Sequence, residues 1–320
     1  MSAAATRVAE ADVAAAGVPA IDLEHVSRWF GNVVAVNDIT FSVGPGVTGL
    51  LGPNGAGKST LLHMISGFLR PSAGAVRIMG AAPSGDPAVY RQVGLVPERE
   101  AVYPFLSGRE FVLLSARLHK LPDPEGAADR ALAAVEMTDV AARATGGYSK
   151  GMKQRIKVAA AIVHDPPVLI LDEPFNGMDP RQRLHMMDLL RTKAAEGRVV
   201  LFSSHILEEV ERLAESVLVV VGGRLAASGD FREIRRLMTD RPHTFRVRSS
   251  DNRRLASVLV ANPGVVGIDL ASDALNVRVV DFDGFTHRIA GAARGAAVSL
   301  LEIVPSDESL ETVFSYLVHR

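Results

Sequence analysis

Cysteine is absent from the 320-residue sequence, which excludes a disulfide scaffold, a cysteine-ligated metal site and thiol catalysis. An excess of either charge is also absent, since 35 lysines and arginines face 36 aspartates and glutamates, for a net charge of −1. A dedicated nucleic-acid binder would carry a basic excess, so we expect no nucleic acid among the partners. Aromatic residues are only 5% of a sequence that is 48% hydrophobic, which indicates a mainly aliphatic core.

Long hydrophobic runs are lacking as well. The longest, such as Val168–Leu171 and Val217–Val221, fall far short of the roughly 18 residues that a membrane-spanning helix needs. The alanine-rich residues 1–19 contain Glu10 and Asp12 and no apolar signal-peptide core, so we interpret them as a flexible tail. These features predict a cytoplasmic protein in which any membrane role comes through a partner.

The chain length suits one large domain followed by a small one. Residues Ile21–Val43 show strand-like alternation, which predicts an antiparallel sheet at the start. Short apolar strands then follow at Val47–Leu51, Val168–Leu171 and Arg198–Phe202, each with a helical stretch after it. Residues 20–238 are therefore predicted to form an α/β domain with a mostly parallel sheet.

A helical subdomain is predicted inside the large domain, over about residues 98–165. Ser107 and Glu110 form a capping-box pattern ahead of an apolar helix face. Asp123 followed by Pro124 predicts the start of a second helix, because aspartate favours the cap position and proline the first turn.

The composition changes near Thr239–Pro242, and residues 243–320 are predicted to form a small α+β domain. Its elements follow the order β-α-β-β-α-β, the ferredoxin-like pattern, with one strand expected at Leu275–Phe282. A last helix is expected with Ser306 as its cap. Two interpretations are open, namely an appendage that packs or stabilises a dimer and a regulatory domain that binds a ligand.

One motif carries specific chemistry, a phosphate-binding loop between the strand Val47–Leu51 and a helix that starts near Lys58. Its glycines let several backbone N–H groups point at one anion, and the helix adds the positive end of its dipole. Lys58 is predicted to bridge the β- and γ-phosphates, Ser59 to ligate Mg²⁺ and Thr60 to add a phosphate contact. The residues of the motif are Gly52, Pro53, Asn54, Gly55, Ala56, Gly57, Lys58 and Ser59.

Two acids follow the buried strand Val168–Leu171, at the end where α/β ligands bind. Asp172 is predicted to hold Mg²⁺, and Glu173 to orient or deprotonate the attacking water. Without a phosphate loop, such a pair would more often cap a helix. His205 follows the strand that ends at Phe202, and we interpret it as a contact to the γ-phosphate, with a structural histidine as the alternative.

Further segments resemble the ATP-binding subunit of ABC transporters. Residues Tyr148–Arg155 are similar to the signature motif of that family, although Lys150 stands where glycine is usual and Met152 where glutamine is usual. Asn176–Asp179 resembles the D-loop. Phe30 stands where the family has an aromatic residue that stacks on adenine.

The resemblance implies an ATPase that uses ATP and Mg²⁺ and works as a dimer. Two subunits would pair head to tail, with each ATP between the phosphate loop of one subunit and the signature of the other. This assigns ATP contacts to Ser149 and Gly151 of the signature and to Asp179 of the D-loop. The adenine contact falls to Phe30, with the adjacent Trp29 as an alternative.

The resemblance also implies a separate integral membrane permease, which the helical subdomain would contact. The chain would then lie on the inner face of the cell membrane, held there by the permease. Both a homodimer and a heterodimer of ATPase subunits stay open, because a complete set of motifs makes the homodimer sufficient but not obligatory.

One departure concerns the metal site. Where the family commonly has glutamine after the strand ending at Pro97, this chain has Glu98. A carboxylate can still ligate Mg²⁺, but unlike an amide it repels the γ-phosphate. We therefore hypothesise that Glu98 contributes more to coupling with the permease than to phosphate binding.

The signature and a C-terminal helix like Ser309–Phe314 resemble the export-type (ABC-2) branch, in which the ATPase and the permease are separate chains. Members of that branch are associated with drugs, antibiotics, lipids and polysaccharides. An importer ATPase, a soluble ABC-type ATPase acting on ribosomes or DNA, and a nucleotide-binding module with little hydrolysis are the alternatives. The cargo is not encoded here, because in such systems the permease contacts it.

Overall fold

A computed structural model describes residues 19–85, 87–99, 102–237, 242–306 and 309–318. The expected flexible tail, apart from its last residue, and most of the segment Thr239–Pro242, where the composition changes, lie outside the described residues. The chain divides into two compact units between Ser228 and Gly229, and each is described by itself.

The first unit is built on a six-stranded sheet in the order β5-β6-β7-β3-β8-β9. The pairs from β5 through β6, β7 and β3 to β8 are parallel, as predicted. All residues of β6 and β7 are buried, because helices or a second sheet cover both faces. The bounds are β3 Gly46–Leu51, β5 Val93–Val96, β6 Val168–Asp172, β7 Val199–Ser203, β8 Ser216–Val221 and β9 Arg224–Gly229.

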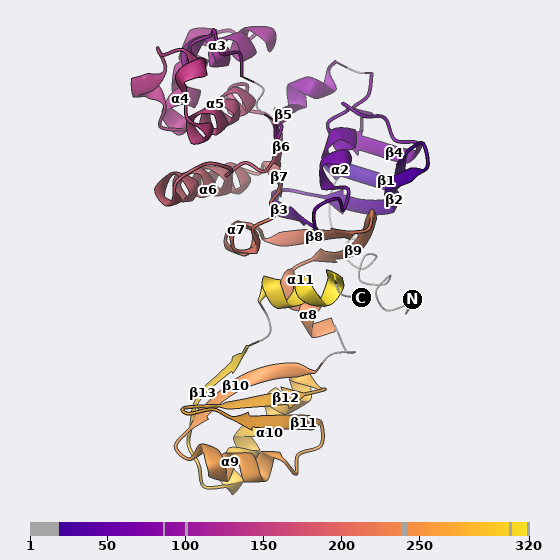
Figure 1. The fold of residues 1–320 in the computed structure, drawn as a ribbon, viewed down its shortest axis with the longest axis vertical. Helices are drawn as coiled ribbons and strands as arrows, with labels where there is room; N and C mark the ends of the chain where they lie inside the picture. The colour runs from indigo at the N-terminus through magenta and orange to yellow at the C-terminus, as the bar shows by residue number, and fades with distance from the viewer. Residues whose placement is uncertain (1–18, 86, 100–101, 238–241, 307–308, 319–320) are drawn as a thin grey trace. The chain divides into compact units, whose positions relative to one another are not determined.

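An antiparallel sheet of three strands, in the order β2-β1-β4, confirms the expected start of the chain. Its strands are β1 Ile21–Phe30, β2 Val33–Val43 and β4 Ala73–Ile78. Figure 1 shows this sheet and helix α2 (Lys58–Ile65) on one side of the six-stranded sheet. The aliphatic core lies between them, with residues such as Leu23, Leu62 and Ile170 fully or almost fully buried.

Helices α5 (Lys150–Ile162) and α6 (Pro180–Ala195) lie on the other side of the parallel sheet (Figure 1). Helices α3 (Gly108–Leu118) and α4 (Pro124–Ala134) pack with α5 as the predicted helical subdomain. Ser107 forms a complete capping box with Glu110, and the Asp123 carboxylate accepts from the N–H of Gly126, so both predicted helix starts are confirmed. A short helix, α7 (Leu207–Leu213), follows β7.

The second unit contains an antiparallel sheet in the order β11-β12-β10-β13, which is the predicted ferredoxin-like arrangement. Helices α9 and α10 pack on one face, with Phe245, Leu255 and Phe285 in the core between them and the strands. The bounds are β10 His243–Ser249, α9 Asn252–Leu259, β11 Val265–Leu270, β12 Leu275–Val279, α10 Phe282–Gly295 and β13 Leu300–Pro305.

Two further helices belong to this unit, α8 (Phe231–Leu237) and α11 (Leu310–Val318). They pack together, and the guanidinium of Arg235 lies 5.2 Å from the ring centre of Tyr316. The sequence pattern instead predicts residues 229–238 as the end of the α/β domain over residues 20–238.

Two local predictions in this unit are wrong. The strand expected at Leu275–Phe282 ends at Val279, because the Asp281 carboxylate caps α10, which begins at Phe282. Ser306 does not cap the last helix. Its N–H continues the pairing of β13 with β10 by donating to the carbonyl of Thr244, and the hydroxyl of Ser309 accepts from the N–H of Thr312 instead.

Among the described residues, no helix is both long enough and apolar enough to cross a membrane.

Candidate functional site

The phosphate loop connects β3 to α2, where the motif predicts it. Gly57 is the residue before α2 and has a φ of +103°, in the region that favours glycine. A Cβ atom at this position would lie 2.4 Å from the carbonyl oxygen of Ala35 on β2. The loop therefore needs glycine here both for its turn and for its close approach to the neighbouring sheet.

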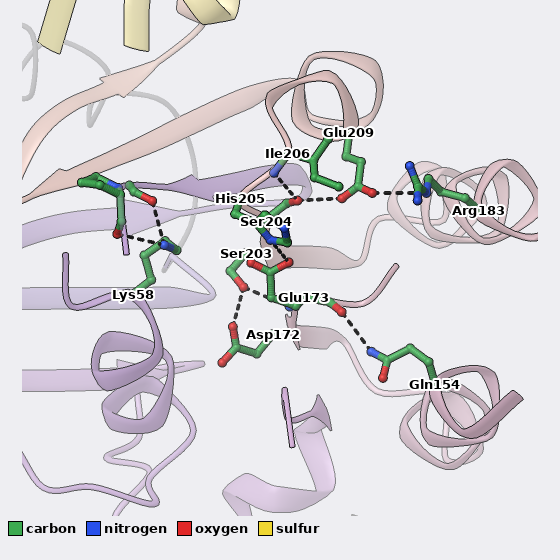
Figure 2. A network of polar contacts seen from close by, with 12 residues as sticks. Lys58, Gln154, Asp172, Glu173, Arg183, Ser203, Ser204, His205, Ile206 and Glu209 are labelled. Atoms are coloured by element: carbon green, nitrogen blue, oxygen red, sulfur yellow. Dashed lines mark hydrogen bonds and ion pairs between the residues drawn. The ribbon is translucent and has the colours of Figure 1, made fainter. Parts of the chain in front are cut away.

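Lys58 is the first residue of α2, and its ammonium group folds back over the loop. Nζ donates to the carbonyl oxygens of Gly52 at 2.7 Å and Pro53 at 3.3 Å (Figure 2). Burial lowers the pKa of Lys58, while the nearby carboxylates of Glu173, Asp172 and Glu98 raise it. The ammonium thus lies between the loop and a group of acids.

A cavity of about 320 Å³ opens over the loop. It joins the phosphate loop to the acids predicted to act on the phosphate and the metal, and to the backbone of β2. Its lining residues are Ala35, Asn54, Gly55, Ala56, Gly57, Lys58, Ser59, Thr60, Glu98, Asp172 and Glu173.

Asp172 ends β6, and its carboxylate is almost completely buried. One oxygen, Oδ1, accepts a hydrogen bond from the Ser203 hydroxyl at 2.5 Å. The other, Oδ2, has no hydrogen-bond partner within the described part of the chain. A buried carboxylate oxygen without a donor is rare, so this oxygen is suited to a cation or to water bound to a cation.

Glu173 follows with a φ of +51°, an unusual left-handed conformation for a residue other than glycine. Contacts from β7, from α5 and from the connection after β7 hold it (Figure 2). Its N–H donates to the Ser203 hydroxyl at 3.0 Å, and its carbonyl oxygen accepts from Nε2 of Gln154 at 3.1 Å. Its side-chain Oε2 lies 2.8 Å from Nδ1 of His205.

Burial raises the pKa of the Glu173 carboxyl group. The hydrogen bond and charge of His205 act in the opposite direction, and the charge of Lys58 does so more weakly. A carboxylate with a raised pKa inside a cleft is the usual form of a general base.

A buried chain of polar contacts begins at the residue next to His205. Ser204, the residue before His205, donates from its hydroxyl to Oε2 of Glu209 at 2.6 Å and accepts from the N–H of Ile206 at 3.0 Å. Glu209, on α7, is 4% exposed and lies 3.2 Å from Nε of Arg183 on α6. Figure 2 shows this chain beside the Glu173–His205 pair.

The remaining predicted ligands do not line the cavity of their own chain. Ser149 caps α5 by accepting from the N–H of Met152, and Asp179 caps α6. Phe30 is half-exposed at the end of β1, with the Arg28 guanidinium 4.6 Å from its ring centre. Trp29 is exposed to the same extent.

Three contributors to the site were missed by the sequence prediction: Ser203, Gln154 and the backbone at Ala35. Ser203 is a polar residue in a fully buried strand, which is a signal of a built site. Gln154 lies within the signature-like segment Tyr148–Arg155, on α5, but nothing in that motif assigns its side chain to the backbone of Glu173. The close approach of the Ala35 carbonyl to the phosphate loop depends on how two sheets pack, and no local sequence pattern predicts that packing.

A second cavity, also of about 320 Å³, lies between the helical subdomain and the parallel sheet. The imidazoles of His119 and His164 stack in it with ring centres 3.6 Å apart, and burial lowers the pKa of His164 to about 4. Buried Lys157 donates to the carbonyl of Pro97 at 2.7 Å. The lining is mainly apolar, with Ser66, Phe68, Tyr90, Val93, Leu95, Pro97, Phe111, Ser115, His119, Lys157, Ala160, Ala161 and His164.

Comparisons with known proteins agree on the family. The family model described as ABC transporter matches residues 36–176. An uncharacterized ABC transporter ATP-binding protein of Nostoc sp. is 36% identical over 67% of this chain, and the match spans 66% of that relative. The Nod factor export ATP-binding protein I of Burkholderia orbicola is 38% identical over 66% of this chain and 71% of the relative.

Solved structures show the same fold. A structure of an ATP-binding subunit of an ABC transporter matches with a TM-score of 0.63 and 32% identity, over 68% of this chain and 92% of the other. A dimeric ATP-binding cassette bound to ADP and Pi matches with a TM-score of 0.61 at 23% identity, over 66% of this chain and 98% of the other, which supports the fold alone. With the phosphate loop, the two acids and the helical subdomain in place, this chain belongs to the family of ABC transporter ATP-binding proteins.

Proposed function

We propose that this chain binds and hydrolyses ATP, dimerises on ATP and powers a separate membrane permease that exports a drug, antibiotic, lipid or polysaccharide. The observation that carries the proposal is the group of acids opposite the phosphate loop, in which Oδ2 of Asp172 is buried and has no hydrogen-bond donor among the residues that the structure describes. Burying such an oxygen costs free energy, and a protein that only binds a partner would not require it.

In the proposed complex, backbone N–H groups of the loop Gly52–Ser59 donate to the β- and γ-phosphates of ATP, except at Pro53, which has no N–H, and Thr60 adds a contact. Lys58 exchanges its two carbonyl contacts for phosphate oxygens, which are better partners for an ammonium because they carry charge. Phe30 stacks on adenine, with its other ring face covered by Arg28.

Mg²⁺ is expected with the nucleotide, and the residues present fit it. Ser59, Asp172 and Glu98 line one cavity and offer the oxygen ligands that Mg²⁺ prefers. The unpartnered Oδ2 of Asp172 is the best-placed of these oxygens, because it has no competing donor among the described residues. When bound, the ion would neutralise charge that develops on the phosphates.

Glu173 is the proposed general base for the water that attacks the γ-phosphate. Its raised pKa favours proton acceptance, and the hydrogen bond from His205 orients the carboxylate. His205 donates from Nδ1 to Glu173, so a second bond from Nε2 to the γ-phosphate requires the doubly protonated imidazolium. When hydrolysis removes the γ-phosphate, the hydrogen bond from Nε2 is lost and His205 keeps only its contact to Glu173.

A dimer is proposed because Ser149, Gly151 and Asp179 lie away from the cavity of their own chain. Ser149 and Gly151 are at the N-terminus of α5, whose dipole attracts anions. In a head-to-tail pair they would close on the nucleotide bound by the other subunit. Homodimer and heterodimer are both compatible with this arrangement.

The permease contact is proposed at the second cavity, which the helical subdomain borders. Pro97 lines this cavity and Glu98 lines the nucleotide cavity, so adjacent residues reach both. Lys157 fixes this segment by donating to the carbonyl of Pro97. A shift of the permease against this surface would thus move Glu98, in keeping with a role of this residue in coupling. Through the permease, the chain would lie on the inner face of the membrane.

Export is favoured over import by the names of the similar proteins, several of which are Nod factor export ATP-binding proteins. The test is a mild-detergent pull-down of the tagged chain from membranes with identification of its partners. We expect an integral membrane protein that lacks an ATPase domain of its own. Recovery of only ribosomal or DNA-associated proteins would contradict the transport proposal while leaving the ATPase chemistry intact.

A further inference from the structure

Gln154 connects the signature segment to the catalytic centre of the same chain. It lies on α5, and its side chain is 5% exposed. Its Nε2 donates to the carbonyl oxygen of Glu173 at 3.1 Å, a contact that Figure 2 shows from α5 to the loop after β6. The N–H of Asn176 approaches the same carbonyl at 3.3 Å, but it comes from the same loop and ties the loop to nothing outside it.

The backbone of Glu173 needs external support. A left-handed φ of +51° brings the Cβ atom of a residue other than glycine close to the following carbonyl oxygen, so it is less stable than an ordinary conformation. The structure supplies support on both sides, with the Ser203 hydroxyl accepting from the N–H and the Gln154 amide donating to the carbonyl. The direction of the Glu173 side chain depends on this conformation, so the two contacts also set where the carboxylate points.

The same face of α5 contacts the D-loop. Gly151 and Gln154 are three residues apart, which places them on one side of the helix. A Cβ atom on Gly151 would lie 2.6 Å from the carbonyl oxygen of Gly177, and the aliphatic part of Lys150 packs against Gly177. The first two turns of α5 therefore rest on the loop that contains Glu173, with Ser149 at the helix end.

We propose that Gln154 is a positioning residue through which the signature segment of one chain sets the Glu173 carboxylate of that same chain. The inference rests on the proposed dimer, in which Ser149 and Gly151 close on the nucleotide of the other subunit. Because Gln154 lies on α5 and donates to the Glu173 carbonyl, a displacement of α5 toward that nucleotide would be transmitted to the backbone of Glu173.

The test uses mixed dimers with two affinity tags, because the proposal concerns which site is damaged. In one dimer, Gln154→Leu and Glu173→Gln are in the same chain, opposite a wild-type chain. In the other, Gln154→Leu is in one chain and Glu173→Gln in its partner. The reference dimer carries Glu173→Gln in one chain only, so every dimer has a single active glutamate.

The first mixed dimer should hydrolyse ATP like the reference, because its active Glu173 keeps its own Gln154. The second should lose at least about tenfold in kcat, since a misdirected catalytic group is costly even when the shift is small. Its affinity for a fluorescent ATP analogue should match the reference. A loss in the first dimer and not in the second would overturn the proposal, because Gln154 would then act through the signature on the opposite site. Equal rates in both dimers would overturn it as well.

Two further variants separate this inference from a folding defect and from failure of the proposed function. Gln154→Glu keeps the shape but replaces the donor with an acceptor, so it should reproduce the loss seen with leucine. Gln92→Leu, a matched change on the turn before β5, should leave the rate at the wild-type value. Absence of ATP hydrolysis or of an ATP-dependent dimer in the wild-type chain would contradict the proposed function itself, a result distinct from equal rates in the mixed dimers.

Discussion

Nδ1 of His205 lies 2.8 Å from Oε2 of Glu173, across the ends of the neighbouring strands β7 and β6. The two side chains come from different segments, but parallel pairing of the strands brings their carboxyl ends together. His205 is half-exposed, whereas the carboxylate of Glu173 is 12% exposed. The histidine is therefore accessible to a ligand while it contacts the buried carboxylate of Glu173.

Replacing the proposed base tests its role directly. Glu173→Gln keeps the shape of the side chain but removes its ability to accept the proton of the attacking water. We expect kcat to fall by about 10²–10⁴-fold, the usual contribution of a general base. ATP binding should persist, so size-exclusion chromatography with ATP and Mg²⁺ should show an accumulated dimer. Multiple turnover near the wild-type rate would remove Glu173 from this role.

The pH dependence of hydrolysis should report the environment of Glu173. The base acts only when deprotonated, so activity falls as the pH drops through its pKa. Burial raises that pKa, and the acidic limb of the kcat profile should therefore lie at a higher pH than for an ordinary glutamate.

His205→Ala should move this limb to a still higher pH, because the hydrogen bond and charge that lower the pKa of Glu173 are lost. The measurement is kcat at saturating ATP across the acidic range. His287→Ala, on α10 in the second unit, is the matched control and should leave the limb in place. An unshifted limb in His205→Ala would mean that the 2.8 Å contact does not control the base.

Much of the site follows from local sequence signals. The phosphate loop and the caps at Ser107 and Asp123 are short patterns whose conformations their own residues dictate, and they are confirmed. Buried aliphatic runs likewise predicted β6 and β7 to within a residue. Such features need little information from the rest of the chain.

Features that depend on packing were not predictable. Nothing in a glutamate indicates the left-handed backbone of Glu173, which exists because Ser203 and Gln154 support it from other elements. Ser306 and Ser309 are equally good caps in sequence, and the extension of β13 pairing to Thr244 decides between them. Contacts across elements select one of several locally acceptable conformations.

Glu98→Gln tests the coupling hypothesis. The substitution restores the residue usual in the family and removes a charge that repels the γ-phosphate. We expect the stimulation of ATPase activity by the permease to fall more than the basal rate, because the segment at Pro97 and Glu98 reaches both cavities. The measurement is the ratio of ATPase rates with and without the co-purified permease. A sharp fall in both basal rate and ATP affinity would instead favour a direct catalytic role.

A substitution in the core of the second unit tests the two interpretations of the C-terminal domain. Leu255 on α9 is completely buried in the core of this unit. Leu255→Ala should lower the free energy of unfolding of the unit by about 2–5 kcal/mol, because a cavity replaces apolar contacts. Trp29 is the only tryptophan and lies in the first unit, so its fluorescence follows that unit while circular dichroism follows both. Denaturant titration should shift the circular dichroism transition and leave the fluorescence transition in place.

Val258→Ala on the same helix is the matched control, since Val258 is 38% exposed and its truncation should change stability by no more than about 0.5 kcal/mol. If the second unit only packs or stabilises a dimer, Leu255→Ala under native conditions should leave the KM for ATP and the kcat of the pre-formed dimer as in the control. A changed KM in the folded variant would favour the regulatory interpretation. A joint shift of both transitions would show instead that the two units unfold together, because loosening one core would then destabilise the other.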